Sequence, residues 1–411
     1  MSEQLAYLYD AVRALPRTAD IELFGLNEVH ARLLRSLCEG LGVRPFRIDD
    51  LSESLELRRG RFLAVRWDVT TAGFGFKQPV MASLLLFSLW RRPGGIRGIT
   101  TLTDGGNVNT CLALAAVGNR LGLWSEHVLS RHFPMDIREY LMARGEGRLA
   151  LIEAPPANAG VEREFYSHLV DRMRTGRYRR SRLCLWHARY GGIASRWMGE
   201  ALAAQCDVGI DDIVLSVGSG STLQGFAIPV KRRFGGRPRI VVSEHEQSAL
   251  FSAAPILDHL RTGAKRDVCE FRTAPSPIPH AVLGPHYDEI NPFLPFQDRA
   301  AVDGTIRYSD STWQEASRFC SSKGIHIGNS SAANVAVARR LASEGRTVLT
   351  FLYEPLRPFY LQGPVHRTAP GPIAAEGLQK AALHAIPFCD TQGGPCCEGQ
   401  PGATDPIMHL R

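Results

Sequence analysis

Residues 212–235 read DIVLSVGSGSTLQGFAIPVKRRFG, an apolar strand that leads through glycine and hydroxyl residues into a helix. Backbone N–H groups, side-chain hydroxyls and the positive end of the helix together form an anion site. The stretch is not a P-loop, because no Gly-Lys-Ser or Gly-Lys-Thr follows, and Leu223 stands where a dinucleotide fingerprint needs its third glycine. It therefore predicts either a plain turn or a phosphate site made of Gly218, Ser219, Gly220, Ser221 and Thr222.

Apolar strands alternate with amphipathic helices on both sides of this stretch. The pattern predicts strands over 61–69, 98–103, 181–190, 212–218, 239–244 and 347–353. It predicts helices over 78–92, 107–122, 194–205, 222–235, 309–324 and 331–343, after a helical start over 1–44. This alternation indicates the α/β class with mostly parallel sheets, and 411 residues suit two domains that share an interface.

The overall composition argues against several other classes of protein. The net charge is +7, but the basic residues are scattered, so the densest run, 174–182, reads as a solvated surface rather than a nucleic-acid site. The chain has no apolar run of membrane-spanning length and opens without a secretory signal, so we expect no membrane partner and a cytoplasmic location. Nine irregularly spaced cysteines favour free thiols, and no metal-ligand spacing is present, so we expect no metal.

Lysine is rare in this chain, and one lysine stands in an unusual place. The 48 basic residues include only the lysines at positions 77, 231, 265, 323 and 380, and lysine alone offers an amine that can be deprotonated. Lys77 lies between apolar residues just before a predicted helix. Since burying an ammonium is costly, such a lysine is paired, deprotonated or covalently used, unless it reaches solvent at the helix start.

Two further junctions between a strand and a helix carry polar residues. In LTDGGNVN, 102–109, Gly105 and Gly106 allow a tight turn and close approach of a ligand, and Asn107 opens the next helix. In GIHIGNSSAANV, 324–335, Ser330 stands at the head of a helix. Each polar residue is predicted either to cap its helix or to contact a ligand.

The order and spacing of these segments resemble the fold-type II pyridoxal-phosphate enzymes, the group of cysteine synthase, cystathionine β-synthase, threonine dehydratase and tryptophan synthase β. The resemblance runs from about Val43 to Gln362. It implies two domains, each with a mainly parallel twisted sheet flanked by helices, an active site in the cleft between them, and a homodimer. It divides the chain into a helical extension (1–44), an N-terminal domain (45–190), a cofactor-phosphate domain (191–365) and a Pro/Gly-rich tail (366–411).

The resemblance also assigns roles to individual residues. Phe74-Gly75-Phe76-Lys77 is similar to the family's Gly-Ser-Phe-Lys, which places the Schiff base with the cofactor on Lys77. By the same likeness Asn107 contacts the ring hydroxyl, the loop from Gly218 to Thr222 holds the phosphate, and Ser330 faces the pyridine nitrogen. The closing segment LYEPLRPFYL, 352–361, is also similar to the cysteine synthase branch.

The substrate side departs from the family pattern. Where the family grips the substrate carboxylate with Thr-Ser-Gly-Asn, this chain has Thr103-Asp104-Gly105-Gly106-Asn107, which looks like the Thr-Asp-Gly-Asn of diaminopropionate ammonia-lyase. That likeness makes Asp104 a catalytic acid or base. The usual Gln-Phe and Asn-Pro stretch is replaced by WHARYGG, and the loop 284–293 adds further polar residues. The predicted substrate-binding residues are Thr103, Asp104, Gly105, Gly106, His187, Arg189 and Tyr190, with Arg189 as a carboxylate clamp.

The resemblance implies an amino-acid-metabolising enzyme whose cofactor is pyridoxal 5'-phosphate and whose Lys77 takes the Cα proton. We expect β-replacement on a β-activated, serine-derived amino acid through an aminoacrylate, in the manner of cysteine synthase and as part of specialised metabolism. The alternative is α,β-elimination of the ammonia-lyase type, which the Thr-Asp-Gly motif supports. A second alternative is a non-catalytic α/β module that binds a phosphorylated ligand through the loop after residue 217 and needs no amine at position 77.

Overall fold

The structure is a computed structural model that describes residues 3–15, 21–43, 46–66, 77–92, 94–129, 135–154, 161–248, 251, 282 and 301–353. All of them belong to one compact unit, Met1–Ile373. The predicted tail (366–411), the loop 284–293, the segment 74–76 before Lys77 and most of LYEPLRPFYL lie outside the described residues.

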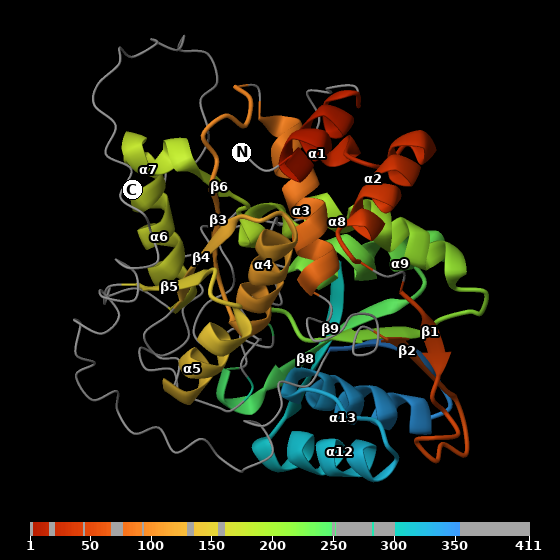
Figure 1. The fold of residues 1–411 in the computed structure, drawn as a ribbon. Coiled ribbons are helices and arrows are strands. Elements are labelled where there is room, and N and C mark those ends of the chain that lie inside the picture. Colours follow the sequence, from red (N-terminus) through yellow and green to blue (C-terminus); the bar gives the residue numbers. More distant parts are fainter. Residues whose placement is uncertain are drawn as a thin grey trace. The chain divides into compact units, whose positions relative to one another are not determined.

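Two sheets are built from the described strands (Figure 1). The larger contains β1 (Ile48–Asp50), β2 (Arg61–Arg66), β7 (Asp212–Leu215), β8 (Arg239–His245), β9 (Val302–Tyr308) and β10 (Thr347–Leu352), in the order β1-β2-β10-β7-β8-β9. The smaller contains β3 (Thr101–Gly105), β4 (Trp124–Leu129), β5 (Leu149–Glu153) and β6 (Arg182–Cys184), in the order β5-β4-β3-β6. Apart from the antiparallel pair β1–β2, all neighbouring strands described are parallel, which confirms the predicted fold class.

The larger sheet joins segments far apart in the chain. Strand β2 pairs in parallel with β10, so that Val65 lies opposite Phe351. Residues 48–66 thus share a sheet with the strands after residue 211, although the predicted division groups them with 45–190. The domain boundaries stay a prediction.

Helices cover the sheets on both sides (Figure 1). The described helices are α1 (Glu3–Arg13), α2 (Glu28–Gly40), α3 (Lys77–Arg91), α4 (Val108–Arg120), α5 (Met135–Arg144), α6 (Val161–Arg174), α7 (Gly176–Ser181), α8 (His187–Gln205), α9 (Ile228–Arg233), α12 (Asp310–Ser322) and α13 (Asn329–Ser343), with short turns at Ile21–Leu23, Leu223–Ala227 (η2) and Glu246–Ser248. Helix α13 packs on the larger sheet, and α12 packs on α13. Helices α4, α5 and α6 contact the smaller sheet, and α8 runs from β6 of the smaller sheet to β7 of the larger.

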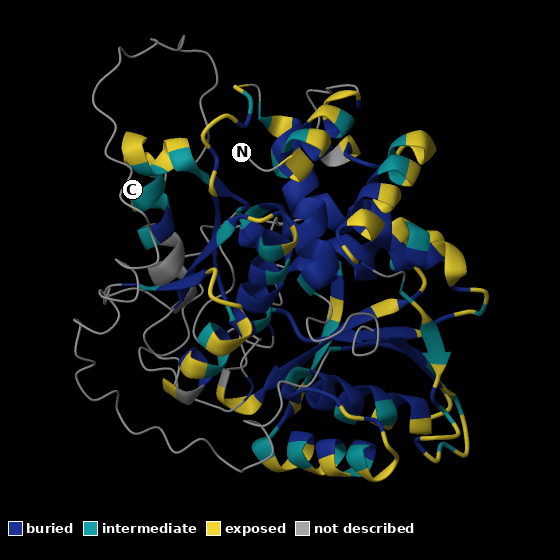
Figure 2. Ribbon diagram, viewed as in Figure 1, coloured by how far each residue is buried: buried dark blue, intermediate teal, exposed yellow. Residues whose placement is uncertain are grey.

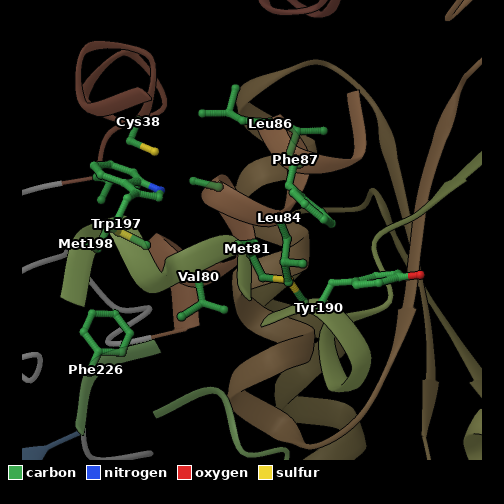
Figure 3. Close-up of a cluster of buried hydrophobic side chains, with 14 of the residues drawn as sticks. Cys38, Val80, Met81, Leu84, Leu86, Phe87, Tyr190, Trp197, Met198 and Phe226 are labelled. Carbon is green, nitrogen blue, oxygen red and sulfur yellow. The ribbon is translucent and has the colours of Figure 1, made fainter. Parts of the chain in front are cut away.

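Helix α3 is the centre of the core. From Gln78 to Trp90 every residue except Ser88 is buried, and Figure 2 shows this helix almost entirely dark blue. A helix that is apolar on all sides must be surrounded by protein, and here α1, α2, α4 and α8 surround it. Figure 3 shows Met81, Leu84 and Phe87 facing Tyr190 of α8. The core therefore holds the first residue of α3, Lys77, in a fixed place.

Sequence periodicity predicted most of the apolar elements and missed several elements that are more polar. The predicted helices over 78–92, 107–122, 309–324 and 331–343 are present within two residues or so of their predicted starts. The predicted strand over 181–190 is wrong from His187 onward, because Trp186 takes a left-handed conformation (φ 56°) and helix α8 begins there. The sequence pattern did not predict β1, β4, β5, β9, α5, α6 or α7.

The described residues contain no helix with the length and hydropathy of a membrane span. Within the same residues, no group of three or more histidine, cysteine or acidic side chains is arranged to hold a metal ion.

Candidate active site

The glycine–serine loop forms one wall of a cavity at the carboxyl end of β7. The space inside this cavity, including the part that is open to solvent, is about 530 Å³. Gly220 has φ +83°, a conformation that favours glycine, and helical structure begins at Ser221. The cavity is lined by Lys77, Asn107, Asn109, Ser216, Val217, Gly218, Ser219, Gly220, Ser221, Thr222, Leu223, Ser330 and Tyr353. Every residue predicted to bind the cofactor is in this set.

Close glycine packing sets the position of the loop against helix α8. After Thr222 the helix opens into a π turn, η2, in which the Ile228 N–H donates to the carbonyl oxygen of Leu223. A Cβ at Gly191 would overlap Ser221 Oγ, and a Cβ at Gly199 would overlap the carbonyl oxygen of Gly225. The loop and α8 therefore approach more closely than side chains would allow, and π turns of this kind are frequent at functional sites.

Lys77 brings an amine to the same cavity. Its Nζ lies 2.9 Å from His187 Nε2 and 3.4 Å from Ser219 Oγ, although Ser219 is 142 positions away in the chain. As the first residue of a buried helix, Lys77 has a backbone fixed by the core while its side chain enters the cavity. The amine and the predicted anion site thus face each other.

His187 lies between the amine and the loop. Its ring is buried, and besides Lys77 its Nε2 lies 3.3 Å from Ser219 Oγ and 3.2 Å from Ser221 Oγ. Burial, and then the charge of Lys77 and the neighbouring His127, lower the pKa of His187 well below its usual 6.5. The imidazole is therefore neutral at neutral pH. These contacts direct the ring toward Lys77 and the loop, and substrate binding by His187 stays a prediction.

Asp104 is buried at the end of β3 and does not line the cavity. Its Oδ2 accepts the backbone N–H of His187 at 2.9 Å, and its Oδ1 accepts the backbone N–H of Gly105 at 2.8 Å. Burial raises the pKa of Asp104 from 3.8 to about 7, against the opposing effect of these hydrogen bonds and of Lys77. The carboxyl group caps the first turn of α8, where Trp186 supplies no cap of its own.

Asn107 combines a cap with a place in the cavity. Its Oδ1 accepts the backbone N–H of Thr110 at 3.3 Å and the Thr110 hydroxyl at 3.1 Å, so it caps α4. The preceding carbonyl, of Gly106, accepts a hydrogen bond of 3.1 Å from His127 Nε2. With Oδ1 committed to the helix, the Nδ2 donor of Asn107 is the group suited to meet a ligand.

Three polar residues that line the cavity were not predicted: Asn109, Ser216 and Tyr353. Tyr353 follows β10 and its hydroxyl lies 3.3 Å from Thr222 Oγ1, while Ser331 Oγ accepts its backbone N–H at 2.6 Å. Ser216 follows β7, the strand next to β10. Polar residues at the carboxyl ends of adjacent parallel strands are the signal that would have identified both.

The other residues predicted to bind substrate do not line the cavity. Thr103 is fully buried, and its hydroxyl is 3.4 Å from the Tyr178 hydroxyl. The ring of Tyr190 packs in the core with its centroid 5.5 Å from that of Phe87. Arg189 lies 5.1 Å above the Tyr190 ring, and neither residue lines the cavity. Gly105 ends strand β3.

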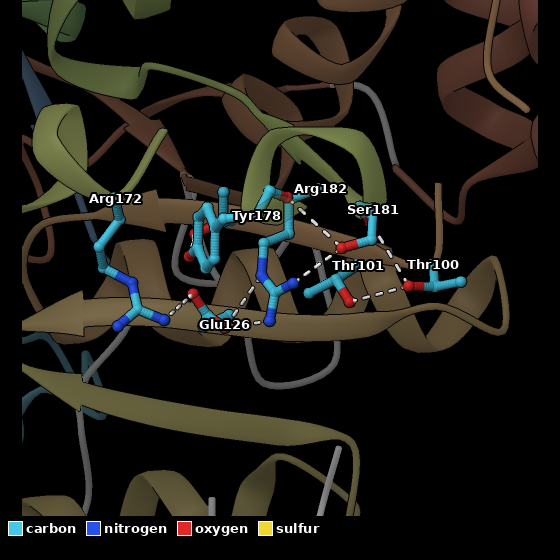
Figure 4. A network of polar contacts seen from close by, with 8 residues as sticks. Thr100, Thr101, Glu126, Arg172, Tyr178, Ser181 and Arg182 are labelled. Carbon is cyan, nitrogen blue, oxygen red and sulfur yellow. Dashed lines mark hydrogen bonds and ion pairs between the residues drawn. The ribbon is translucent and has the colours of Figure 1, made fainter. Parts of the chain in front are cut away.

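Tyr178 belongs to a separate polar network on the smaller sheet (Figure 4). Glu126, 1% exposed, accepts hydrogen bonds from Arg172 at 3.2 Å and Arg182 at 3.0 Å. Both guanidinium groups also lie on the Tyr178 ring, 4.5 and 4.0 Å from its centroid. The basic run 174–182 is therefore partly engaged inside the protein.

The lining residues fit pyridoxal phosphate. A phosphate needs backbone N–H groups, hydroxyls and no nearby acid, and the loop offers Ser219, Ser221 and Thr222 beside a helix start with no Asp or Glu in the lining. An aldehyde needs an amine, and Lys77 Nζ is near the loop. A pyridine nitrogen needs a hydroxyl, which Ser330 provides from the first turn of α13.

Comparison with known proteins gives matches over most of the chain. The model of a family described as pyridoxal-phosphate dependent enzyme matches residues 41–352. The chain is 26% identical over 274 residues to cysteine synthase 1 of Emericella nidulans (64% of this chain, 66% of that protein). It is 24% identical over 320 residues to cystathionine beta-synthase of Rattus norvegicus (76% and 52%). It thus spans less than two thirds of the length of either curated relative.

A solved structure shares the fold. The crystal structure of O-acetylserine dependent cystathionine beta-synthase from Helicobacter pylori matches with a TM-score of 0.58 at 20% identity. The match covers 78% of this chain and 94% of that one. At this identity the likeness shows the fold alone, and it agrees with the fold-type II prediction.

Proposed function

The chain belongs to the family of pyridoxal-phosphate-dependent enzymes, and from this premise we propose that it catalyses β-replacement on a serine-derived amino acid. Membership makes pyridoxal phosphate the cofactor and sets aside the non-catalytic module. The relatives named cysteine synthase and cystathionine beta-synthase support the reaction class at a coarse level. The substrate and the nucleophile belong to the proposal.

One observation carries the proposal: Lys77 Nζ lies 3.4 Å from Ser219 Oγ inside a cavity that Ser330 also lines. An amine and an anion site in one cavity suit a phosphorylated aldehyde. A neutral hydroxyl in the same cavity suits a ring nitrogen that stays unprotonated, which favours loss of a group from Cβ.

The cofactor would be held by three walls of the cavity. The loop from Gly218 to Thr222 would hold the phosphate, Asn107 Nδ2 would face the ring hydroxyl, and Ser330 Oγ would face the ring nitrogen. When bound, pyridoxal phosphate supplies an electron sink for the electron pair left at Cα of an amino acid. Because the phosphate is held separately, release of Lys77 from the cofactor would not release the cofactor from the protein.

Lys77 is the group we assign to proton transfer. Once its amine is free, Nζ takes the proton from Cα, and the leaving group departs from Cβ with its electron pair. A nucleophile then bonds to Cβ, and Nζ returns the proton to Cα. No other amine lines the cavity among the described residues.

The substrate carboxylate would meet the start of helix α4. Asn107 and Asn109 line the cavity from its first turn, and α4 extends over 13 residues, so its N-terminus favours an anion. The carboxyl group of Asp104 is turned toward α8, so it would not repel the substrate carboxylate at this place.

The experiment supplies O-acetylserine, O-phosphoserine and diaminopropionate to the purified chain, with and without thiol or amine nucleophiles. β-Replacement predicts a new amino acid only when a nucleophile is present. Keto acid and ammonia at equal rates with and without nucleophile would instead establish elimination, the reaction suggested by Thr103-Asp104-Gly105. Lack of any product with all three donors would overturn the proposed substrate class.

A further inference from the structure

The structure holds three side chains from two separate segments around a single imidazole nitrogen. His187 Nε2 lies 2.9 Å from Lys77 Nζ, 3.3 Å from Ser219 Oγ and 3.2 Å from Ser221 Oγ. We propose that His187 is a positioning residue that directs the Lys77 amine toward the cofactor. This inference rests on Lys77 as the attachment site, which is part of the proposed function, but not on the fate of the substrate.

The imidazole is held in place by its own backbone. The N–H of His187 donates to Asp104 Oδ2 at 2.9 Å, which joins the first turn of α8 to the end of β3. One turn later, Gly191 has no side chain, and a Cβ there would lie 3.2 Å from His187 Cδ2 and overlap Ser221 Oγ. Glycine at position 191 thus lets the ring and the loop meet.

The ring stays uncharged in this setting. It is 2% exposed, and burial is the main cause of its lowered pKa. The titratable groups around it are the Lys77 amine from α3, the Asp104 carboxyl group from β3 and His127 from β4. A neutral imidazole offers a lone pair or an N–H at Nε2 according to its tautomer, so it can bond either an ammonium or an amine.

The other ring nitrogen supports the same inference. His187 Nδ1 is buried and has no hydrogen-bond partner among the described residues. A buried polar atom without a partner is costly, and a histidine kept only for packing would not carry that cost. We therefore attribute the presence of histidine at position 187 to the contacts that its Nε2 makes.

Fixing the amine matters because lysine has a long and mobile side chain. The Lys77 backbone is held by the core, but four side-chain bonds can still rotate, and ordering them costs about 2 kcal/mol of conformational entropy. A hydrogen bond from a rigid ring favours the rotamers that point into the cavity. It would speed the formation of the covalent bond without changing how the phosphate is held.

The test compares His187→Leu, which has no polar atom, with His187→Gln, whose amide can reach the place of Nε2. His245→Gln serves as a control, since His245 is also buried but bonds to Asp310. The full-length chain freed of cofactor is mixed with pyridoxal phosphate, and the rate of appearance of the visible absorbance of the lysine linkage is recorded. Affinity for pyridoxine phosphate, which cannot form the linkage, is measured separately.

We expect His187→Leu to slow linkage about tenfold, the effect of losing one hydrogen bond, with the affinity for pyridoxine phosphate kept within about threefold. His187→Gln should recover most of the rate. Three results would overturn the inference: linkage by His187→Leu at the rate of the unchanged chain, equal slowing by both variants, or a loss of pyridoxine phosphate affinity as large as the loss of rate. A chain that forms the linkage but performs no β-replacement would contradict the proposed reaction and leave this inference standing.

Discussion

The carboxyl group of Asp104 on β3 accepts the backbone N–H of His187 at the start of α8, over 2.9 Å. The two residues are 83 positions apart, and their contact joins the smaller sheet to the helix that leads to the phosphate loop. It replaces the helix cap that Trp186 cannot provide. A residue that resembles a catalytic acid or base in the sequence thus has a structural partner in the fold.

Replacing Asp104 should affect stability first. In Asp104→Leu two buried N–H groups, of Gly105 and His187, lose their acceptor, and we expect the free energy of unfolding to fall by about 1–3 kcal/mol for each. Asp104→Asn keeps one acceptor, so its free energy of unfolding should lie between those of the unchanged chain and of Asp104→Leu. Chemical denaturation measures the change. A variant with unchanged stability but greatly reduced turnover would show that the carboxyl group acts on the substrate.

Acid should destabilise the protein through His127. Burial lowers the pKa of His127 from 6.5 to about 4. The neutral histidine therefore contributes in full to the free energy of unfolding above pH 6.5. This contribution is lost as the pH falls toward 4, because the unfolded chain binds the proton first. The loss amounts to roughly 3 kcal/mol. In His127→Gln, whose amide can still donate to Gly106, this part of the pH dependence should disappear from the unfolding free energy measured between pH 4 and 7. If the unfolding free energy of His127→Gln depended on pH as steeply as that of the unchanged chain, the prediction would be wrong.

Gly191→Ala should damage the phosphate loop. The added Cβ overlaps Ser221 Oγ, so we expect a loss of about 1–3 kcal/mol in stability and weaker binding of pyridoxine phosphate. Gly40→Ala is the matched control, because Gly40 is also helical and has nothing within 4 Å of the added atom. Titration calorimetry and thermal unfolding of both variants make the comparison; similar behaviour of the two would refute the close packing.

Lys77→Arg keeps the positive charge but cannot form the covalent bond. We expect no pyridoxyl adduct on this peptide after borohydride reduction, and turnover lowered by at least about a hundredfold. Lys231 pairs with Asp303 and does not line the cavity, so Lys231→Arg should keep the adduct and the turnover of the unchanged chain. Mass spectrometry of the reduced protein locates the adduct, and an adduct on any other lysine would disprove the assignment.

Removing the buried charge of Glu126 should be costly. Glu126→Leu leaves Arg172 and Arg182 without their shared carboxylate, and breaking a buried pair in this way costs about 3–5 kcal/mol. Asp171→Asn removes an exposed partner of Arg174 and should cost at most about 1 kcal/mol. Urea denaturation of the two variants distinguishes these outcomes; equal and small effects would mean that the network is not a determinant of stability.

Local pattern predicted much of the site. A glycine–hydroxyl loop before a helix, an isolated lysine before an apolar helix and an asparagine after two glycines are all local signals, and the structure brings Lys77, Asn107, the loop and Ser330 to one cavity. The missed strand β4 shows the limit of this reasoning. It buries Glu126 and His127, whose partners lie on other segments, so its sequence lacks the apolar run of a buried strand.

The sequence by itself determined the class of the fold and the residues that could form a phosphate site, because strand, turn and helix signals depend on neighbours in the chain. Only the tertiary structure decided which polar side chains enter the cavity. Asp104 and His187 both stand where a strand gives way to a helix, yet one caps a helix and the other contacts Lys77. Their roles depend on which segments the core packs side by side, and burial then decides their charge.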